Sequence, residues 1–261
     1  MKSIIAVIIA AGLLLGGCSK SDGPSGPSGQ GEIRMSLIDA PAGYDAVNIV
    51  VTEVSVHKAD SDTSSGWIVL NNNTHTYNLL SLTNGVTAIL AQTTLDAGMY
   101  TQMRLKLGSG CTVVVNGVQA ALDVSANSDL RLVHPFTVTS NGTAGLTLDF
   151  DAAHSIHAFG LAQFKLVPVI RTVDDDNAGS ISGTVSPALA RATVSTVAGS
   201  DTIRVATDSA SGTFKLMAVP SGTYSVFVTP SNTFYADTTI ASVKVQGGAN
   251  TSLGTISLRA R

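Results

Sequence analysis

The chain has few charged residues and few cysteines, and both shortages limit the class of protein to which it can belong. Charged residues make up 13% of its 261 residues, roughly half the share of an average soluble protein. The formal net charge is -3, so the sequence lacks a basic surface for a phosphate backbone, which argues against nucleic acid as a partner. Cys111 opens an apolar run, and we expect it to be a buried packing residue.

Motifs of the common enzyme classes are also missing. The chain has no Gly-x-Ser-x-Gly elbow, His-Glu-x-x-His helix, Cys-x-x-Cys pair, phosphate-binding loop or Gly-x-Gly-x-x-Gly turn. We therefore expect a noncatalytic protein without a cofactor. Hydrolase activity stays open as an alternative, because Ser, His and Asp side chains from distant positions can converge in a fold.

The first 18 residues follow the pattern of an export signal. Lys2 precedes an apolar run over residues 4–15, which is shorter than the roughly 20 residues of a membrane-spanning helix. Leu15-Gly16-Gly17-Cys18 resembles the lipobox of bacterial lipoproteins, and the resemblance implies cleavage before Cys18 and acylation of its thiol and new amine. Ser19 follows, and the same resemblance implies outer-membrane sorting. An ordinary secretory leader with an incidental cysteine is the alternative.

Residues 1–17 are thus the expected signal peptide, and residues 18–30 are the expected tether. The tether is rich in Gly, Ser and Pro and has no large apolar side chain, which is typical of a flexible linker. Two or three acyl chains would hold the protein on a bilayer, because each buried CH₂ contributes about 0.8 kcal/mol. The sequence predicts a lipid-anchored envelope protein, with the membrane as its first partner.

Almost every later stretch alternates apolar and polar residues with a period of two, which is typical of half-buried strands. Residues 101–107 show the pattern most clearly. Asn116-Gly117 predicts a type I′ hairpin turn, because that turn requires positive φ at both central residues. The stretch 46–58 changes its alternation at Thr52-Glu53, which predicts a β-bulge there.

Helical signal is scarce. Residues 86–91, after the turn-forming residues 83–85, favour one short helix. Asp151 is a suitable N-cap for another helical turn over residues 151–156. Neither segment is long enough to build a helical bundle.

We therefore expect an all-β fold of two β-sandwich domains, the first with one or two short helical connections. The first domain is expected over residues 31–173 and the second over residues 179–261. Residues 174–178, an acidic run with nothing to bury, are the expected linker. Seven short strands separated by Gly, Pro, Ser and Asp are expected in the second domain.

The second domain contains three motifs that follow one another in a characteristic order. They are Gly179-Ser-Ile-Ser-Gly183-Thr-Val185, Gly212-Thr-Phe214-Lys-Leu216 and Val219-Pro220-Ser-Gly222-Thr-Tyr224. Together they resemble the carboxypeptidase regulatory-like domains, which form a seven-stranded transthyretin-like sandwich. The resemblance implies a fold without an active site, in a sandwich class that shares its shape with starch-binding-like domains.

The first domain also carries motifs of a known family. They are Ser36-Leu-Ile-Asp39-Ala40-Pro41, Gly66-Trp67, Ala97-Gly98-x-Tyr100-Thr-Gln102-x-Arg104-Leu105, His134-Pro135-Phe136 and Leu148-Asp149-Phe150-Asp151. This set resembles a bacterial lipoprotein family known only as the domain of unknown function numbered four thousand three hundred and eighty-two. The resemblance implies no particular activity.

Asp149, Asp151, His154 and His157 form the cluster that could carry metal chemistry. A helical turn after Asp151 would place the two histidines on one face. Two imidazoles and a carboxylate could bind Zn²⁺ and leave one position for water, which would suit a metal-dependent hydrolase. The alternative is that Asp151 caps the turn and both histidines lie in solvent.

Exposed aromatic rings are the features that could bind sugars, because a ring face packs against the apolar face of a sugar. Trp67 begins an expected strand, and Phe234 and Tyr235 lie in a loop of the second domain. Carbohydrate recognition by the second sandwich is therefore one binding hypothesis, and capture of an envelope protein is another. Core packing of all three rings is the alternative, and the sequence leaves the oligomeric state open.

Overall fold

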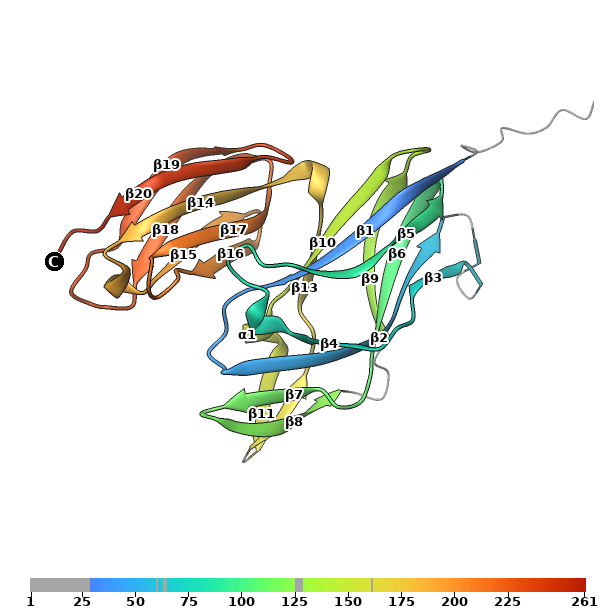
Figure 1. The fold of residues 1–261 in the computed structure, drawn as a ribbon, viewed down its shortest axis with the longest axis horizontal. Coiled ribbons are helices and arrows are strands. Elements are labelled where there is room, and N and C mark those ends of the chain that lie inside the picture. Colours follow the sequence, from blue (N-terminus) through green and yellow to red (C-terminus); the bar gives the residue numbers. More distant parts are fainter. Residues whose placement is uncertain (1–28, 60, 63–64, 125–128, 161) are drawn as a thin grey trace, which may run out of the picture.

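The computed structural model describes residues 29–59, 61–62, 65–124, 129–160 and 162–261. Almost every regular element in these residues is a β-strand, and the strands form two units (Figure 1). This confirms the predicted all-β, sandwich-type fold. No helix in the described part of the chain is long and apolar enough to cross a membrane. The predicted signal peptide, Cys18 and most of the predicted tether lie outside the described residues.

The first unit, residues 30–174, contains a four-stranded sheet in the order β13-β10-β1-β5 and a nine-stranded sheet. The larger sheet runs β11-β12-β8-β7-β2-β6-β9, and β3 and β4 also pair with β2. The strands are β1 (Gln30–Asp39), β2 (Ala46–Lys58), β3 (Trp67–Asn71), β4 (His75–Asn78), β5 (Ala88–Asp96), β6 (Gly98–Leu107), β7 (Thr112–Val115), β8 (Val118–Val124), β9 (Asp129–Val138), β10 (Thr143–Phe150), β11 (Ile156–Gly160), β12 (Gln163–Leu166) and β13 (Ile170–Asp174).

Alternation along β1 and β10 builds the core of the first unit. Ile33, Met35 and Leu37 of β1 are completely buried, and their neighbours in the parallel strand β10 include Leu148 and Phe150, also completely buried. Full burial of a side chain of this size contributes about 1.5–3 kcal/mol. The other face of these two strands carries polar residues and turns toward the second unit.

The second unit, residues 178–260, contains a three-stranded sheet in the order β17-β14-β20 and a four-stranded sheet in the order β16-β15-β18-β19. Its strands are β14 (Ala178–Ser186), β15 (Ala192–Ala198), β16 (Asp201–Ala206), β17 (Thr213–Pro220), β18 (Gly222–Pro230), β19 (Thr238–Val245) and β20 (Asn250–Ser257). All seven predicted strands are present. Side chains such as Ile181, Val194 and Val226 are completely buried between the sheets.

Several local predictions for the first unit are confirmed. Asn116 and Gly117 have φ values of 50° and 75° in the turn between β7 and β8. The pairing of β2 with β6 shifts register between Val51 and Glu53, at the predicted bulge. Asp151 caps the helix α1 (Ala152–Ser155), with its side chain accepting a hydrogen bond from the His154 backbone amide. Cys111 is buried, and burial raises the pKa of its thiol.

The helix predicted over residues 86–91 is wrong. Residues 88–96 form the strand β5, antiparallel to β1, and the helical turn nearby is η1 (Leu79–Ser81). The open edge of β1 supplies backbone partners for this segment, and Leu90 becomes completely buried. Pairing and burial therefore outweigh the local helical preference.

The boundary between the units is tighter than the predicted solvated linker. Asp174 ends β13, the helical turn η2 (Asp175–Asn177) follows at once, and Ala178 begins β14. Asp174 accepts a hydrogen bond from His134, and Asp175 accepts one from Thr147. These partners hold the acidic run in place. At the N-terminal end of the first unit, β1 begins at Gln30, which is the last residue of the predicted tether.

Candidate binding site at the junction of the two units

The two units meet where the polar face of the first unit's four-stranded sheet lies against β17 of the second (Figure 1). A small apolar cluster of Ile38, Val173, Ala178 and Ala218 is buried there. Two polar crevices are lined by residues of both units, and one of them includes Ala178 and Ala218 of this cluster. They bring together side chains that are distant in the sequence.

The predicted metal ligands lie beside this junction, but three of them are already engaged. Asp149 accepts a hydrogen bond of 2.7 Å from Arg171. Asp151 accepts one of 3.2 Å from Arg204 of β16, and its carboxylate lies 2.7 Å from Nδ1 of His154. His157 is exposed in β11 opposite Lys165. The described residues contain no group of three or more His, Cys, Asp or Glu side chains that could hold a metal ion.

Both arginines of these ion pairs also make a contact across the junction. Arg204 belongs to the second unit and Asp151 to the first, so their hydrogen bond crosses the junction. Arg171 crosses it too, donating at 2.8 Å to the carbonyl oxygen of Ala218 while it holds Asp149. They line a crevice of about 600 Å³. Arg171 and Arg204 thus each have a carboxylate partner and a hydrogen bond that crosses the junction.

Asp39 is a buried carboxylate near this site that the sequence analysis did not identify as a candidate functional residue. Its side chain is 6% exposed, Oδ1 accepts a hydrogen bond from the amide of Ala152, and Oδ2 has no partner among the described residues. Burial, with the nearby carboxylates of Asp149 and Asp151, raises the pKa of Asp39 to about 8. The available signal was its position in the apolar run of residues 37–40.

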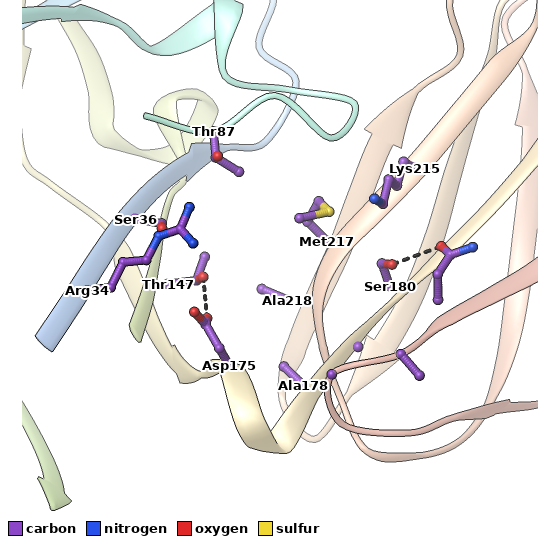
Figure 2. A pocket seen from close by; sticks show the side chains of 14 residues that line it. Arg34, Ser36, Thr87, Thr147, Asp175, Ala178, Ser180, Lys215, Met217 and Ala218 are labelled. Atoms are coloured by element: carbon purple, nitrogen blue, oxygen red, sulfur yellow. Dashed lines mark hydrogen bonds between the residues drawn. The ribbon is translucent and has the colours of Figure 1, made fainter. Parts of the chain in front are cut away.

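A second crevice forms a pocket of about 370 Å³ between the units, which we call the junction pocket (Figure 2). Its walls come from β1, β10 and the loop before β5 on one side, and from β14, β17 and the turn before β20 on the other. Figure 2 shows Arg34 and Lys215 on opposite sides of it. The lining residues are Arg34, Ser36, Thr87, Thr147, Asp175, Ala178, Gly179, Ser180, Lys215, Met217, Ala218, Gly248, Ala249 and Asn250.

Strand alternation places the polar groups of the first wall. Arg34 and Ser36 stand on the opposite face of β1 from its core residues, and Arg34 pairs across the sheet with Gly145. Gly145 leaves room for Asp175, whose Oδ2 would lie 2.6 Å from a Cβ added at that glycine. Asp175 Oδ1 accepts a hydrogen bond of 2.6 Å from Thr147. Asp175 is therefore oriented by the sheet beneath it.

The loop before β5 positions Lys215 on the opposite wall. Asn84 has a φ of 56°, and its side-chain oxygen accepts a hydrogen bond of 2.7 Å from the Lys215 amide. Its side-chain amide donates to the carbonyl oxygen of Thr213. Asn84 thus satisfies the free edge of β17 as a neighbouring strand would. The aliphatic part of Lys215 lies over Gly85, whose added Cβ would be 3.0 Å from Lys215 Cδ.

The junction pocket is lined by two basic side chains, Arg34 and Lys215, and by one acidic side chain, Asp175. Neither Arg34 nor Lys215 forms an ion pair with any residue in the described ranges. Asp175, the acidic side chain in the lining, is hydrogen-bonded to Thr147. Ser180 donates a hydrogen bond of 2.9 Å to Asn250. Such a pocket can bind an anion with hydroxyl groups, and sequence reasoning missed it because each cation is an isolated basic residue in a strand.

The predicted sugar-binding aromatics lie in different places. Trp67 is in the first unit, with the guanidinium carbon of Arg104 at 4.5 Å and that of Arg131 at 5.6 Å from its ring centroid. Phe234 is 61% exposed and contacts Tyr235 edge to face at 5.2 Å. Tyr235 packs against the core of the second unit. The structure therefore brings Phe234 to the surface and leaves Trp67 under arginine side chains.

A family model for the Domain of unknown function (DUF4382) matches residues 30–168. The match covers more than half of the chain. The protein therefore belongs to this family, which confirms the domain family inferred for the first region, whereas its lipoprotein nature stays a prediction. The resemblance of residues 179–261 to carboxypeptidase regulatory-like domains stays a prediction. No curated protein matches the chain.

Among solved structures, an N-terminal interface mutant of a type II cohesin–X-dockerin complex from Acetivibrio cellulolyticus is similar at 27% identity and a TM-score of 0.26. That match covers 31% of this chain and 58% of the other, so this chain spans less than two thirds of that protein. A minor pilin of Streptococcus agalactiae is 14% identical, with 90% of this chain and 97% of that chain covered and a TM-score of 0.26. A mutant shaft pilin of Lactobacillus rhamnosus GG is 10% identical, with 90% and 98% covered and a TM-score of 0.26.

Proposed function

We propose that this protein is a noncatalytic envelope lipoprotein that binds a ligand in the junction pocket. The observation that carries the ligand site is the pair of cations, Arg34 and Lys215, that face one pocket of about 370 Å³ without an ion-pair partner among the described residues. A pocket of this size falls within the range of small-molecule sites, about 300–1,000 Å³. Because its walls belong to both units, docking of the units creates the site.

Methionine methyl groups offer a direct test of ligand binding. Met217 lines the junction pocket, whereas Met99 is 51% exposed in β6 of the first unit and lies outside the lining. We expect small molecules extracted from the envelope of the source cells to shift the ¹³C-methyl signal of Met217 in the mature protein and to leave Met99 unchanged. Shifts at Met99 alone, or at neither residue, would contradict a ligand site at the junction.

The membrane anchor is the second part of the proposal, and it rests on the lipobox-like residues 15–18. Mass spectrometry of the mature protein should find acyl chains on Cys18 and no residue before it. A Cys18→Ala variant should move from the membrane fraction to the soluble fraction, because it loses the buried chains. Density-gradient separation of the two membranes tests the outer-membrane location. An unmodified Cys18 in membrane-free protein would refute the anchor.

Carbohydrate binding by the second unit is the other candidate function, and exposed Phe234 is the observation that favours it. A glycan array with the mature protein tests it. Phe234→Ala should abolish retention of a glycan that the second unit binds at this ring, because the ring would supply the stacking face. Phe159→Ala is the matched control, since Phe159 is 60% exposed in the first unit. Equal retention by both variants would remove Phe234 from consideration.

A further inference from the structure

We propose that the junction pocket binds an acidic sugar, a small hydroxylated molecule whose carboxylate or phosphate group is attracted by both Arg34 and Lys215. The inference rests on the proposed ligand site and names the chemistry of its ligand. The two cations approach the pocket from opposite walls (Figure 2). Hydroxyl and amide groups lie on the walls between them.

The charge of the pocket favours an anion. Its lining holds two cations and one carboxylate, on a chain whose formal net charge is -3. A guanidinium group presents a planar fork of donors that matches a carboxylate or phosphate, and an ammonium group acts as a compact point charge. Arg34 and Lys215 therefore offer complementary ways to hold one oxyanion.

The scaffold already fixes part of this arrangement. Asn84 holds the backbone of Lys215, and Gly85 lies beneath the aliphatic part of its side chain. Arg34 lies in the central strand β1, which is paired with β10 on one side and with β5 on the other. The fixed backbone of both residues reduces the conformational freedom lost on binding, and the exposed Arg34 side chain is ordered by the ligand.

Hydroxyl groups on the ligand would meet polar partners on both walls. Ser36 and Thr147 line the first wall, and Ser180 and Asn250 line the second. The negative charge of Asp175 repels a bound anion. Its carboxylate is oriented by Thr147, however, and can accept a hydrogen bond from a ligand hydroxyl. The volume of about 370 Å³ lies near the lower end of the range for small-molecule sites, which suits one or two sugar rings.

The neighbouring crevice of about 600 Å³ fits this ligand less well, although it is larger. Arg171 already holds Asp149 within the first unit, and Arg204 holds Asp151 across the junction. An anion would have to displace one of these carboxylates and weaken the docking of the units. The junction pocket needs no such exchange.

The test is calorimetric titration of the mature protein in detergent with glucuronate, glucose 6-phosphate, glucose and inorganic phosphate. We expect saturable binding of at least one acidic sugar, with weaker binding at higher ionic strength because salt screens the two cations. The tighter of the two acidic sugars identifies the anionic group as a carboxylate or a phosphate. Glucose and inorganic phosphate should each bind at least about tenfold more weakly, since each lacks one set of contacts.

Two variants and one control locate the site. Arg34→Gln and Lys215→Gln should each weaken acidic-sugar binding about tenfold or more, the loss expected for a hydrogen bond to a charged group. Lys244→Gln is the control, because Lys244 is exposed in β19 outside the pocket and changes the net charge equally. Unchanged melting temperatures would show that the variants are folded. If one variant does not fold, the salt dependence and Arg34→Lys, which keeps the charge but loses the fork, still test the site.

The possible failures are distinguishable. Binding of glucose as tight as that of glucuronate, or binding unaffected by Arg34→Gln and Lys215→Gln, would overturn the acidic-sugar inference. Tight binding of inorganic phosphate alone would overturn it as well. If envelope extracts shift the Met217 methyl signal while neither acidic sugar does, the ligand site stands and this identification of its ligand is wrong.

Discussion

Asp39 shows how a single buried group can make the stability of the protein depend on pH. Its pKa is raised from 3.8 to about 8, chiefly by burial and also by Asp149 and Asp151. Between these values the folded chain keeps the proton that the unfolded chain releases. Stability is therefore highest below pH 3.8 with respect to this group, falls as pH rises toward 8, and stays low above it.

Asp39→Asn should remove this pH dependence. An asparagine oxygen can still accept the hydrogen bond from the Ala152 amide, and the amide cannot ionise. We expect the variant to gain several kcal/mol at about pH 9 and little at about pH 4, since each pKa unit corresponds to about 1.4 kcal/mol. Denaturant unfolding at several pH values measures this. Asp123→Asn, at an exposed position, is the control, and an identical pH slope in Asp39→Asn and the unaltered protein would contradict the assignment.

At the scale of elements, the strands followed from the sequence where alternation alone decides the structure. The seven strands of the second unit, the bulge in β2 and the turn at Asn116-Gly117 were all predictable, because each depends on nearby residues. β5 was not, since residues 88–91 become a strand only when β1 offers its edge. Pairing between segments so far apart leaves no local signal.

The loop before β5 illustrates such a long-range role, and Asn84 is the residue that tests it. Asn84→Ala removes both hydrogen bonds to β17 and places alanine at a φ of 56°. We expect a loss of about 1–3 kcal/mol, because each lost hydrogen bond costs about 1 kcal/mol and the backbone conformation adds strain. Denaturant unfolding measures the loss.

Hydrogen exchange separates the two causes. The backbone amide of Lys215 should exchange faster in Asn84→Ala, because its acceptor is gone. Asn84→Gly is the matched control: glycine tolerates the positive φ, so it should lose the hydrogen bonds without the strain. If the Lys215 amide exchanges at the same rate in both variants and the unaltered protein, Asn84 does not hold β17.

At the scale of the whole molecule, the junction is the feature that sequence reasoning could not supply. Of the four predicted metal ligands, Asp149, Asp151 and His154 lie at the junction, and their arginine partners lie 22 to 53 residues further along the chain. With those partners in place, the cluster connects the two units. The same docking forms the junction pocket, so the ligand site could not be found before the units were assembled.

Arg171 is one of the residues whose hydrogen bonds cross the junction, and it tests the docking of the units. It donates to Ala218 of the second unit and to Asp149 of the first, and both of its partners lie within the junction. Arg171→Met would leave the largely buried Asp149 without its cation. Removing one partner of a buried ion pair typically costs about 3–5 kcal/mol. We therefore expect calorimetry to show a lower melting temperature and a separate transition for each unit.

A double substitution distinguishes lost docking from a simple loss of stability. Adding Asp149→Asn to Arg171→Met removes the uncompensated charge, so much of the stability of the first unit should return. The contact to Ala218 stays lost, so the two transitions should remain separate and acidic-sugar binding should remain weak. Lys165→Met, at an exposed position on β12, is the control. A single transition at an unchanged temperature in Arg171→Met would mean that the remaining contacts, which include the apolar cluster and the hydrogen bonds of Arg204 and Asn84, hold the units together without this arginine.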